Sequence, residues 1–493
     1  MRRWQEGDDV TRKFGFAARM LTSVALLAIG ALIPIGAGWI DYPLPSQSPR
    51  AGFKSELPGA IARSLDAKLA DVVTVADFGA APAANDNTAA INRAAQALSS
   101  DGTAGGCLRF SAGTFKIAGT ISLPSGVGIC GDLRSKTDNG AIGTLLLGTG
   151  ASGQVLLQIG TGSDNPNFNY VQDIAIGFSR PQTAGAAIVV RNAHTVSLQR
   201  IFIGINNYLG LRLEGGNGQY NYLLEDIEIG AGWRGIWAGP AMSGKPALVQ
   251  NITMKNVKIA AQRDACIYLQ HVSGLETGVG VECLNSERGL VVQPGVGEIV
   301  KSVISSSLVL DANKQENLLI APTGAGCDPY VSGKAPPCGL VGQVQLVNLW
   351  AASSERGPGI RIDTTGGGVV DGLNLVGVTS GNNFASGIET KGPNLSNLFI
   401  TAPLIGYNNV GGGASSGINF GEGSKYFSVV GGCVGACGKF YPGLVNKQKY
   451  GVSVGRGSSH YSIMGVVASG NAKGGLEGAQ DGAGSAVSGI VGD

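Results

Sequence analysis

Short apolar strands recur along most of this chain at intervals of about 25 residues, a period typical of repeat proteins. The strand returns at near-regular spacing between positions 187 and 292, and it recurs later in the chain. The segments share the order small, apolar, variable, usually apolar, and they begin at Gly210, Gly235, Cys266, Gly289, Gly359 and Gly451. A short unit repeated in this way predicts a solenoid, in which each repeat packs only on its neighbours.

A second apolar segment alternates with the first. Its copies keep nearly the same spacing within two runs, which begin at Val171, Leu198, Leu224 and Met254, and later at Val344, Val370 and Leu395. Two short strands per repeat, with little helical pattern between them, describe one coil of a parallel β-helix. The fold class we expect is therefore all-β, a single-stranded parallel β-helix whose coils stack about 4.8 Å apart.

The composition agrees with this fold and narrows the function. Glycine accounts for 80 of the 493 residues, far above its usual share, but it shows no collagen-like period of three. A hydrophobic content of 43% is enough for a long core and excludes a disordered chain. The formal net charge of +2 gives no support for nucleic acid as a partner.

The N-terminal residues 1–40 have the features of an export signal. Five basic residues precede an apolar run at 20–40, which small residues close at 36–38. The run is also long enough to span a bilayer, so a cleaved signal peptide and an uncleaved membrane anchor both remain open. Either predicts a secreted, periplasmic or cell-surface protein.

The rest of the chain divides by composition. After the apolar run we expect a linker at 41–56 and an N-terminal cap with the first coils at 57–132. The parallel β-helix follows at 133–469, and a glycine- and alanine-rich tail occupies 470–493. Because a solenoid is one continuous unit, these parts predict one long domain.

The eight cysteines fall into four pairs of sequence neighbours, Cys107/Cys130, Cys266/Cys283, Cys327/Cys338 and Cys433/Cys437. The spacing of the first pair is close to one coil, so stacked cysteines would be placed to form disulfides, which fits an exported protein. The alternative is that a pair consists of buried thiols acting as small hydrophobic groups. No Cys/His cluster has zinc-ligand spacing, and no metal site is predicted.

Two helices are expected ahead of the first coils. Residues 58–69 can form an amphipathic helix with Ile61 on its apolar side, and the strand and turn Val-Val-Thr-Val-Ala-Asp-Phe-Gly follow at 72–79. Thr88 is the expected N-cap of a second helix that runs through Leu98. Glycine-rich strands at 105–131 complete the first coils.

This arrangement resembles the pectate lyase superfamily, in particular its rhamnogalacturonase/epimerase-like module. The Arg-Ser-x-x-x-Lys-Leu helix leading into Val-x-Asp-Phe-Gly is also similar to the entry segment of phage tailspike depolymerases. The resemblance implies a right-handed parallel β-helix with a short N-terminal helical cap, and a polysaccharide as partner or substrate. The similarity to phage tailspikes also implies a homotrimer.

The chain departs from the family's active-site patterns. The stretch Ala-Ala-Asn-Asp-Asn-Thr at 83–88 keeps a helix cap but lacks the usual paired aspartates. The paired-aspartate signature of polygalacturonases and the Tyr-Gly-x-Asp-Pro-His pattern of alginate epimerases are also missing. The resemblance therefore supplies no catalytic residues. Calcium serves some pectate lyases, but no acidic cluster here requires it, so no cofactor is predicted.

Aligning the coils on the first strand predicts a column of side chains along one edge of the β-helix. Tyr208, Trp233, Asp264 and Glu287 take the same position, two before the small residue, in four consecutive coils. Asp264 and Glu287 would then lie about 5 Å apart, a spacing that retaining glycosidases use, and one pKa of the pair would rise to supply an acid. We predict these two as catalytic, with Tyr208 and Trp233 as flat surfaces for sugar rings.

Arginines gather at the same edge, namely Arg234, Arg263 and Arg288, with Arg356 in a later coil. Guanidinium groups bind carboxylates through two hydrogen bonds, so they favour an acidic polysaccharide. The alternative is that they form exposed ion pairs of little energetic consequence. Trp237 and Tyr268, beside Arg212 on the outward face of the first strand, form a second predicted binding strip, although such ladders also stabilise sheets.

Two function classes follow. The first is an exported enzyme that cleaves an acidic polysaccharide, by hydrolysis or by β-elimination. The second is a non-catalytic surface protein, or a prophage tailspike-like receptor-binding protein, that binds glycan through the same repeats.

Overall fold

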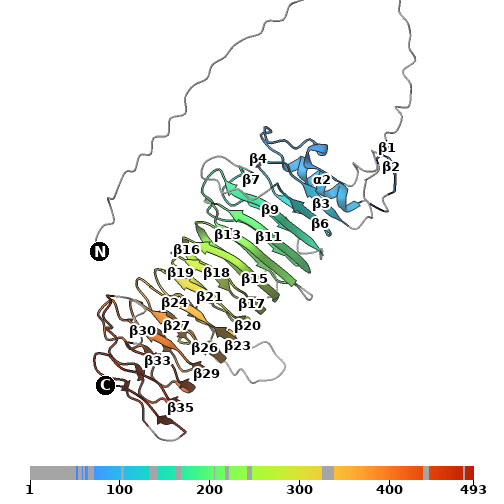
Figure 1. Ribbon diagram of the computed structural model, residues 1–493. Helices are drawn as coiled ribbons and strands as arrows, with labels where there is room; N and C mark the ends of the chain where they lie inside the picture. The colour runs from blue at the N-terminus through green and yellow to red at the C-terminus, as the bar shows by residue number, and fades with distance from the viewer. Residues whose placement is uncertain are drawn as a thin grey trace, which may run out of the picture. The chain divides into compact units, whose positions relative to one another are not determined.

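The structure is a computed structural model that describes residues 52–53, 58, 61–64, 72–100, 105–132, 143–160, 168–204, 206–216, 221–240, 247–324, 338–436, 443–480 and 484–492. The chain separates into two units, Met1–Asp66 and Ala67–Asp493. The second unit is a right-handed parallel β-helix, as predicted, and its coils follow one another from β3 to β37 (Figure 1).

The first predicted strand motif forms one side of every coil. These strands pair in parallel, each with the strands of the coils before and after it, in a 13-stranded sheet that we call the front sheet. Its members, in sheet order, are β5 (Ile121–Leu123), β8 (Val155–Ile159), β10 (Ala186–Arg191), β12 (Leu209–Glu214), β14 (Gly232–Gly239), β16 (Gln262–Leu269), β19 (Arg288–Val292), β22 (Leu318–Ile320), β25 (Ile360–Asp363), β28 (Ile388–Lys391), β31 (Ile418–Phe420), β34 (Val452–Val454) and β36 (Leu476–Glu477).

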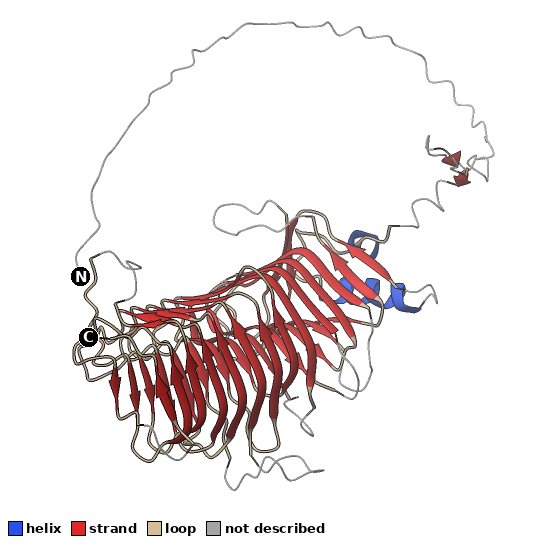
Figure 2. Ribbon diagram, turned by 60° about the horizontal axis from the view of Figure 1, so that its bottom comes forward, coloured by secondary structure: helices blue, strands red, loops and turns tan. Residues whose placement is uncertain are grey.

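The remaining strands of the coils form the other sides, again in parallel ladders (Figure 2). They are β3 (Gly106–Arg109), β4 (Gly113–Ile117), β6 (Val127–Cys130), β7 (Thr144–Gly148), β9 (Asn169–Phe178), β11 (Thr195–Ile203), β13 (Asn221–Ile229), β15 (Val249–Ala260), β17 (Val272–Thr277), β18 (Val281–Leu284), β20 (Ile299–Ser305), β21 (Leu308–Asp311), β23 (Leu340–Val347), β24 (Leu349–Ala352), β26 (Val369–Val376), β27 (Thr379–Gly381), β29 (Leu395–Thr401), β30 (Leu404–Gly406), β32 (Lys425–Val430), β33 (Cys433–Val434), β35 (Ser459–Met464) and β37 (Ala486–Ser488).

These strands bend at residues in the left-handed backbone region. Strand β15 contains two such residues, Asn251 at φ 49° and Asn256 at φ 48°. We call the column that contains Asn251 the first bend and the column that contains Asn256 the second bend. Asparagine, aspartate and glycine adopt this conformation most readily, which explains the turn-forming residues that recur there.

The bends refine the prediction of two short strands per coil. The segments beginning at Val171 and Leu224 cross the second bend, whereas those beginning at Val370 and Leu395 cross the first. Both bends place a left-handed residue between apolar ones, so these four segments share one local pattern but occupy different sides of the coil. Periodicity alone does not separate them.

A helix covers the N-terminal end of the stack (Figures 1 and 2). Helix α2 spans Thr88–Ser100, and it buries Ile91, Ala94 and Ala95 in the same core cluster as the first coils. Thr88 is the first helical residue rather than the predicted N-cap, and its N–H donates to the carboxylate of Asp86 at 2.9 Å. This helix provides the predicted helical cap.

The segment before α2 differs from the prediction. The predicted strand at 72–79 is a single bridge from Thr74 to Arg109, followed by the 3-10 helix η1 (Val75–Phe78). Thr74 caps η1 because its side chain accepts the N–H of Asp77, and Gly79 ends η1 in the left-handed region. The predicted strand is too short to form because this cap turns the chain immediately.

The expected helix at 58–69 is wrong where the structure describes it. In the first unit Arg63–Ser64 forms strand β2, which pairs antiparallel with β1 (Gly52–Phe53). Ile61, placed on the apolar side of that helix, is 77% exposed. Arg63 and Ser64 are extended in their pairing with β1, which excludes a helix through these residues. The expected signal or anchor and the first part of the linker, at 1–51, lie outside the described residues.

The cysteines divide between disulfides and buried thiols. Cys107 and Cys130 form a disulfide between β3 and β6, as predicted. Cys266 and Cys283 are free and buried, so this pair follows the alternative interpretation. Cys338 and Cys433 are disulfide-bonded, and Cys327 and Cys437 lie outside the described residues. Burial, followed by the contact with Cys266, raises the pKa of the Cys283 thiol.

The stack continues into the glycine- and alanine-rich tail at 470–493. Strands β36 and β37 pair with β34 and β35 and extend two sides of the solenoid. None of the helices in the described part of the chain is long and apolar enough to span a membrane.

Candidate functional site

The outward surface of the front sheet carries an aromatic cluster. Register pairs Arg212 with Trp237 and Trp237 with Tyr268 in three successive coils, as the sequence predicted. Tyr208 and Trp233 stack with ring centroids 4.8 Å apart, and Trp233 meets the edge of Trp237 at 5.9 Å. Trp237 and Tyr268 are in edge contact at 6.0 Å. Both predicted aromatic groups therefore belong to one cluster.

Arg234 lies at the centre of this cluster. Its guanidinium carbon is 4.0 Å from the ring centroid of Trp233 and 3.5 Å from that of Tyr268. Its Nε donates to Asp264 Oδ2 at 2.5 Å. Aromatic faces attract cations and the carboxylate neutralises the charge, so Arg234 is held in one orientation. Burial raises the pKa of Tyr268, which keeps this side chain a neutral phenol that donates to Gln293 at 3.0 Å.

A β-bulge places Arg263 and Asp264 at this surface. Gly232 pairs with Gln262 but Arg234 pairs with Ala265, so Arg263 and Asp264 together oppose Trp233. An extra residue in one strand redirects the neighbouring side chains. Arg263 is exposed and donates through Nε to the carbonyl oxygen of Gly232 at 3.3 Å. No acidic partner of Arg263 occurs among the described residues.

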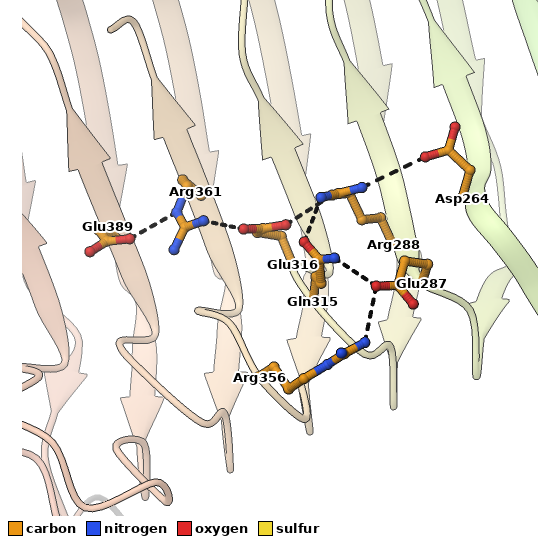
Figure 3. A network of polar contacts seen from close by, with 8 residues as sticks. All are labelled: Asp264, Glu287, Arg288, Gln315, Glu316, Arg356, Arg361 and Glu389. Carbon is orange, nitrogen blue, oxygen red and sulfur yellow. Dashed lines mark hydrogen bonds and ion pairs between the residues drawn. The ribbon is translucent and has the colours of Figure 1, made fainter.

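The two predicted catalytic carboxylates lie in adjacent coils but have separate partners (Figure 3). Asp264 is held by Arg234 and, at 3.6 Å, by Arg288. Glu287 Oε1 accepts from Gln315 Nε2 at 2.6 Å and from Arg356 at 3.0 Å. Each carboxylate is therefore paired with its own guanidinium partners.

The polar network extends beyond the predicted residues into later coils. Glu316 accepts from Arg288 at 3.1 Å and also from Arg361, which in turn donates to Glu389 at 2.9 Å. Figure 3 shows these side chains in a row across neighbouring strands. A cavity of 260 Å³ opens beside them, lined by Gln315, Glu316, Arg356, Gly357 and Arg361. Sequence reasoning identified Arg356 here but did not assign Gln315, Glu316, Arg361 or Glu389 to the site.

One feature of the sequence hid Glu316. In its coil the position just before strand β22 holds Asn317, where the motif has a small residue, so this coil does not match the motif. Asn317 is fully buried and donates to the carbonyl oxygen of Ala352 at 2.7 Å, so it satisfies the turn by a different route. The signal that was available is the acidic residue shortly before an apolar triplet at 318–320.

Arg212 differs from the other predicted binding groups because it is buried, with 2% of its side chain exposed. It lies 3.7 Å from the ring centroid of Trp237 and pairs with the buried Glu214. Burial lowers the pKa of Arg212 to about 10. Arg212 therefore supports the aromatic cluster from behind and does not face a ligand.

Part of the chain matches a known family model. Residues 72–290 match the model described as rhamnogalacturonase A/epimerase, pectate lyase-like. This region is therefore similar to the pectate lyase superfamily. The match confirms the resemblance drawn from the entry segment, and it includes the aromatic cluster and both predicted carboxylates. No curated protein sequence matches the chain.

Phage tailspikes share the fold. Tailspike protein 3 of bacteriophage CBA120 aligns at a TM-score of 0.52 and 15% identity, over 90% of this chain. This chain spans 63% of the length of that protein. The tailspike protein of E. coli bacteriophage HK620, solved in complex with a pentasaccharide, aligns at 0.53 and 13% identity, over 85% of this chain and 76% of its own. At these identities the likeness shows the fold alone. Among the described residues, no group of three or more His, Cys, Asp or Glu side chains is placed to hold a metal ion.

Proposed function

We propose that this protein is glycan-active and that it binds an acidic polysaccharide across the outward surface of the front sheet. The observation that carries the proposal is the pair of exposed guanidinium groups, Arg263 beside the aromatic cluster and Arg356 beside Glu287. The side chain of Arg356 is 58% exposed and makes a single ion pair with Glu287. Both arginines therefore keep N–H donors for the carboxylate of an acidic sugar.

The spacing of the two arginines suits an extended ligand. Arg263 belongs to the coil of β16 and Arg356 shortly precedes β25, three coils later. Three coil steps correspond to about 14 Å, which is enough for a short run of sugar units. Between them lie Glu287 and the polar network with its cavity. The aromatic rings, which offer apolar faces to pyranose rings, belong to the coils of β12, β14 and β16, at and before the coil of Arg263. The match to the family model and the pentasaccharide bound by the HK620 protein support this class of ligand.

The test is binding of the purified full-length chain to polygalacturonate, alginate and hyaluronate, by affinity electrophoresis and calorimetry. We expect at least one of these acidic polymers to bind, and we expect Arg263→Ala and Arg356→Ala each to weaken binding about tenfold, because each removes a hydrogen bond to a charged group. Arg109→Ala is the matched control, since Arg109 is an exposed arginine on β3 outside the front sheet. Equal loss in all three variants, or no acidic ligand, would contradict the proposal.

A second candidate function is cleavage of the bound glycan. The observation that favours it is the position of Asp264 and Glu287 in adjacent coils, with Arg356 beside Glu287. Two carboxylates serve hydrolysis as acid and nucleophile, whereas elimination needs a cation on the uronate carboxylate and a base for the C5 proton. Hydrolysis and elimination both require the bound glycan to displace some of the arginine side chains that now pair with Asp264 and Glu287.

Cleavage is tested on the same polysaccharides by following reducing ends and the ultraviolet absorbance of unsaturated uronates together. Reducing ends without absorbance indicate hydrolysis, and both signals together indicate elimination. Asp264→Asn and Glu287→Gln should then abolish turnover while binding is retained. Binding without either signal would leave the chain as a non-catalytic glycan-binding protein.

We also propose that the protein is exported. The disulfide between Cys107 and Cys130 supports this, because such bonds persist mainly in oxidising compartments. Cell fractionation combined with N-terminal sequencing of the mature chain tests it. A new N-terminus near residue 38 indicates a cleaved signal, an intact N-terminus in the membrane fraction indicates an anchor, and a cytoplasmic chain contradicts export.

A further inference from the structure

A second aromatic surface lies near the C-terminal end of the solenoid, on a side formed by β29, β32, β35 and β37. Phe399 is 46% and Tyr426 is 51% exposed, and the ring of the exposed His460 lies 5.0 Å from that of Tyr426. All three line a cavity of 440 Å³ together with Asn397, Phe427, Ser428, Tyr461, Ser462, Gly484, Ser485 and Ala486. No residue of the front sheet contributes to this cavity.

Tyr426 occupies a backbone position that large aromatic side chains rarely take, and His460 follows it in the next coil. Both belong to the first bend, with φ of 55° and 56°. In the preceding coils this column holds only residues that tolerate or favour turns, namely Asn251, Gly274, Ser302, Gln343, Gly372 and Asn397. A bulky residue in the left-handed region costs free energy, and such strain is concentrated at functional positions.

The neighbouring residues are adjusted to these rings. A Cβ at Gly484 would come within 2.8 Å of the His460 ring, so the glycine makes room for the imidazole. Beneath the surface, Phe427 and Tyr461 stack at 4.9 Å with nearly parallel rings. This inner pair is buried and supports the strands that carry Tyr426 and His460. The exposed rings are therefore held on a rigid base.

The lining indicates the chemistry of a ligand. Apart from the aromatic rings it consists of amide, hydroxyl and backbone groups, and the described lining residues include no carboxylate, lysine or arginine. The hydroxyl groups of Ser428 and Ser462 have no hydrogen-bond partner within the described part of the chain. Flat half-exposed rings beside free hydroxyl groups suit an uncharged ring that bears hydroxyl groups of its own.

We propose that this cavity is a second carbohydrate site, which stacks a neutral sugar ring on Tyr426, His460 and Phe399. It is separate from the outward surface of the front sheet and does not depend on the acidic ligand proposed there. A protein with both sites would bind glycan at two sides of the solenoid. The two sites would hold either two separate glycans or two segments of the same glycan.

The bend geometry provides a sharp test. Asparagine favours the left-handed region, so Tyr426→Asn and His460→Asn restore the residue type of earlier coils and should melt at or above the temperature of the wild type. Saturation-transfer NMR and calorimetry with cellohexaose, maltohexaose and mannohexaose then measure binding to the full-length chain. We expect at least one hexaose to bind, and each of the two variants to weaken it about fivefold to tenfold.

Tyr426→Phe keeps the ring and should retain binding. Trp237→Ala removes a ring of the front-sheet cluster and should leave hexaose binding unchanged, which separates the two sites. The proposal is overturned if none of the three hexaoses binds, if Tyr426→Asn binds as well as the wild type, or if Trp237→Ala alone abolishes the signal.

Discussion

His271 shows how one buried side chain couples this fold to pH. Only 7% of the residue is exposed, and its Nδ1 accepts the backbone N–H of Ile299 at 2.9 Å. Burial lowers the pKa of His271, because the charged imidazolium is poorly solvated there. Protonation also removes the acceptor that Ile299 requires. The folded state therefore prefers the neutral ring.

The expected result is a loss of stability under mildly acidic conditions. As the pH falls below about 6.5, the unfolded chain takes up a proton at this histidine before the folded chain does, so unfolding becomes more favourable. His271→Asn keeps an acceptor for Ile299 without titrating. Its melting temperature should fall less than that of the wild type between pH 7 and pH 5. His194→Gln is the control, and an unchanged slope in His271→Asn would refute this assignment.

Individual residues also explain which parts of the site could be predicted from the sequence. The aromatic cluster and its arginines were found because their coils start with glycine or another small residue, which made the register readable. The partners of Asp264 and Glu287 were not found, since ion pairing depends on side-chain direction, and the bulge at Arg263 alters that direction locally. A shared column in the sequence places two carboxylates in adjacent coils but does not show which guanidinium each one meets.

At the scale of elements, a ladder of buried amides joins successive coils near their turns. Asn383 Nδ2 donates to Asn408 Oδ1 at 2.9 Å, and Asn408 donates to Gln448 at 3.0 Å. Gln448 continues to Asn471 at 2.9 Å. Asn383 Oδ1 also accepts the N–H of Ser354 at 3.0 Å. These side chains satisfy backbone groups that the turns would otherwise leave unpaired in the interior.

Breaking this ladder should be costly. Asn383→Ala leaves several buried groups without partners, and we expect it to lower the free energy of unfolding by about 3 kcal/mol. Asn374→Ala is the matched control, because Asn374 lies shortly before Asn383 in the chain, on β26, and is partly exposed; its effect should stay below about 0.5 kcal/mol. Urea unfolding followed by circular dichroism measures both. Equal effects would mean that the ladder does not contribute stability.

The elements were predictable where apolar spacing determines them. The positions of the front-sheet strands in the sequence could be predicted because these strands are short and follow small residues at a regular interval. The second set was assigned to one column although it crosses two different bends, since Asn256 and Gly372 produce the same local pattern. The N-terminal helix was expected from an amphipathic pattern, and the exposure of Ile61 shows that a pattern alone does not supply the packing partner.

For the whole molecule, the N-terminal coils are secured by both a cap and a covalent bond. Helix α2 packs on the first coils, and the disulfide joins β3 to β6 at a sequence separation of 23. Closing a loop of that size in the unfolded chain is worth about 3 kcal/mol. The coils near this end therefore resist opening from the edge of the stack.

Removing the disulfide should loosen that end first. In the variant with Cys107→Ser and Cys130→Ser, hydrogen–deuterium exchange should accelerate in β3, β4 and β6 while β25 and β28 keep their protection. Cys266→Ala and Cys283→Ala together are the control, because these buried thiols form no bond. Uniform exchange along the solenoid would show that the bond does not act locally. The homotrimer implied by the tailspike resemblance stays a prediction, which light scattering of the full-length chain tests.

The constant rise of the coils has a consequence for how such a protein changes over evolution. The coils that carry Arg263 and Arg356 are three coil steps apart, because the parallel ladders of the front sheet connect β16, β19, β22 and β25 in register. Gaining or losing one complete coil would lengthen or shorten the recognised segment by about 4.8 Å and leave every side chain in its own layer. Ligand length can thus be adjusted by duplication, independently of the chemistry within each coil.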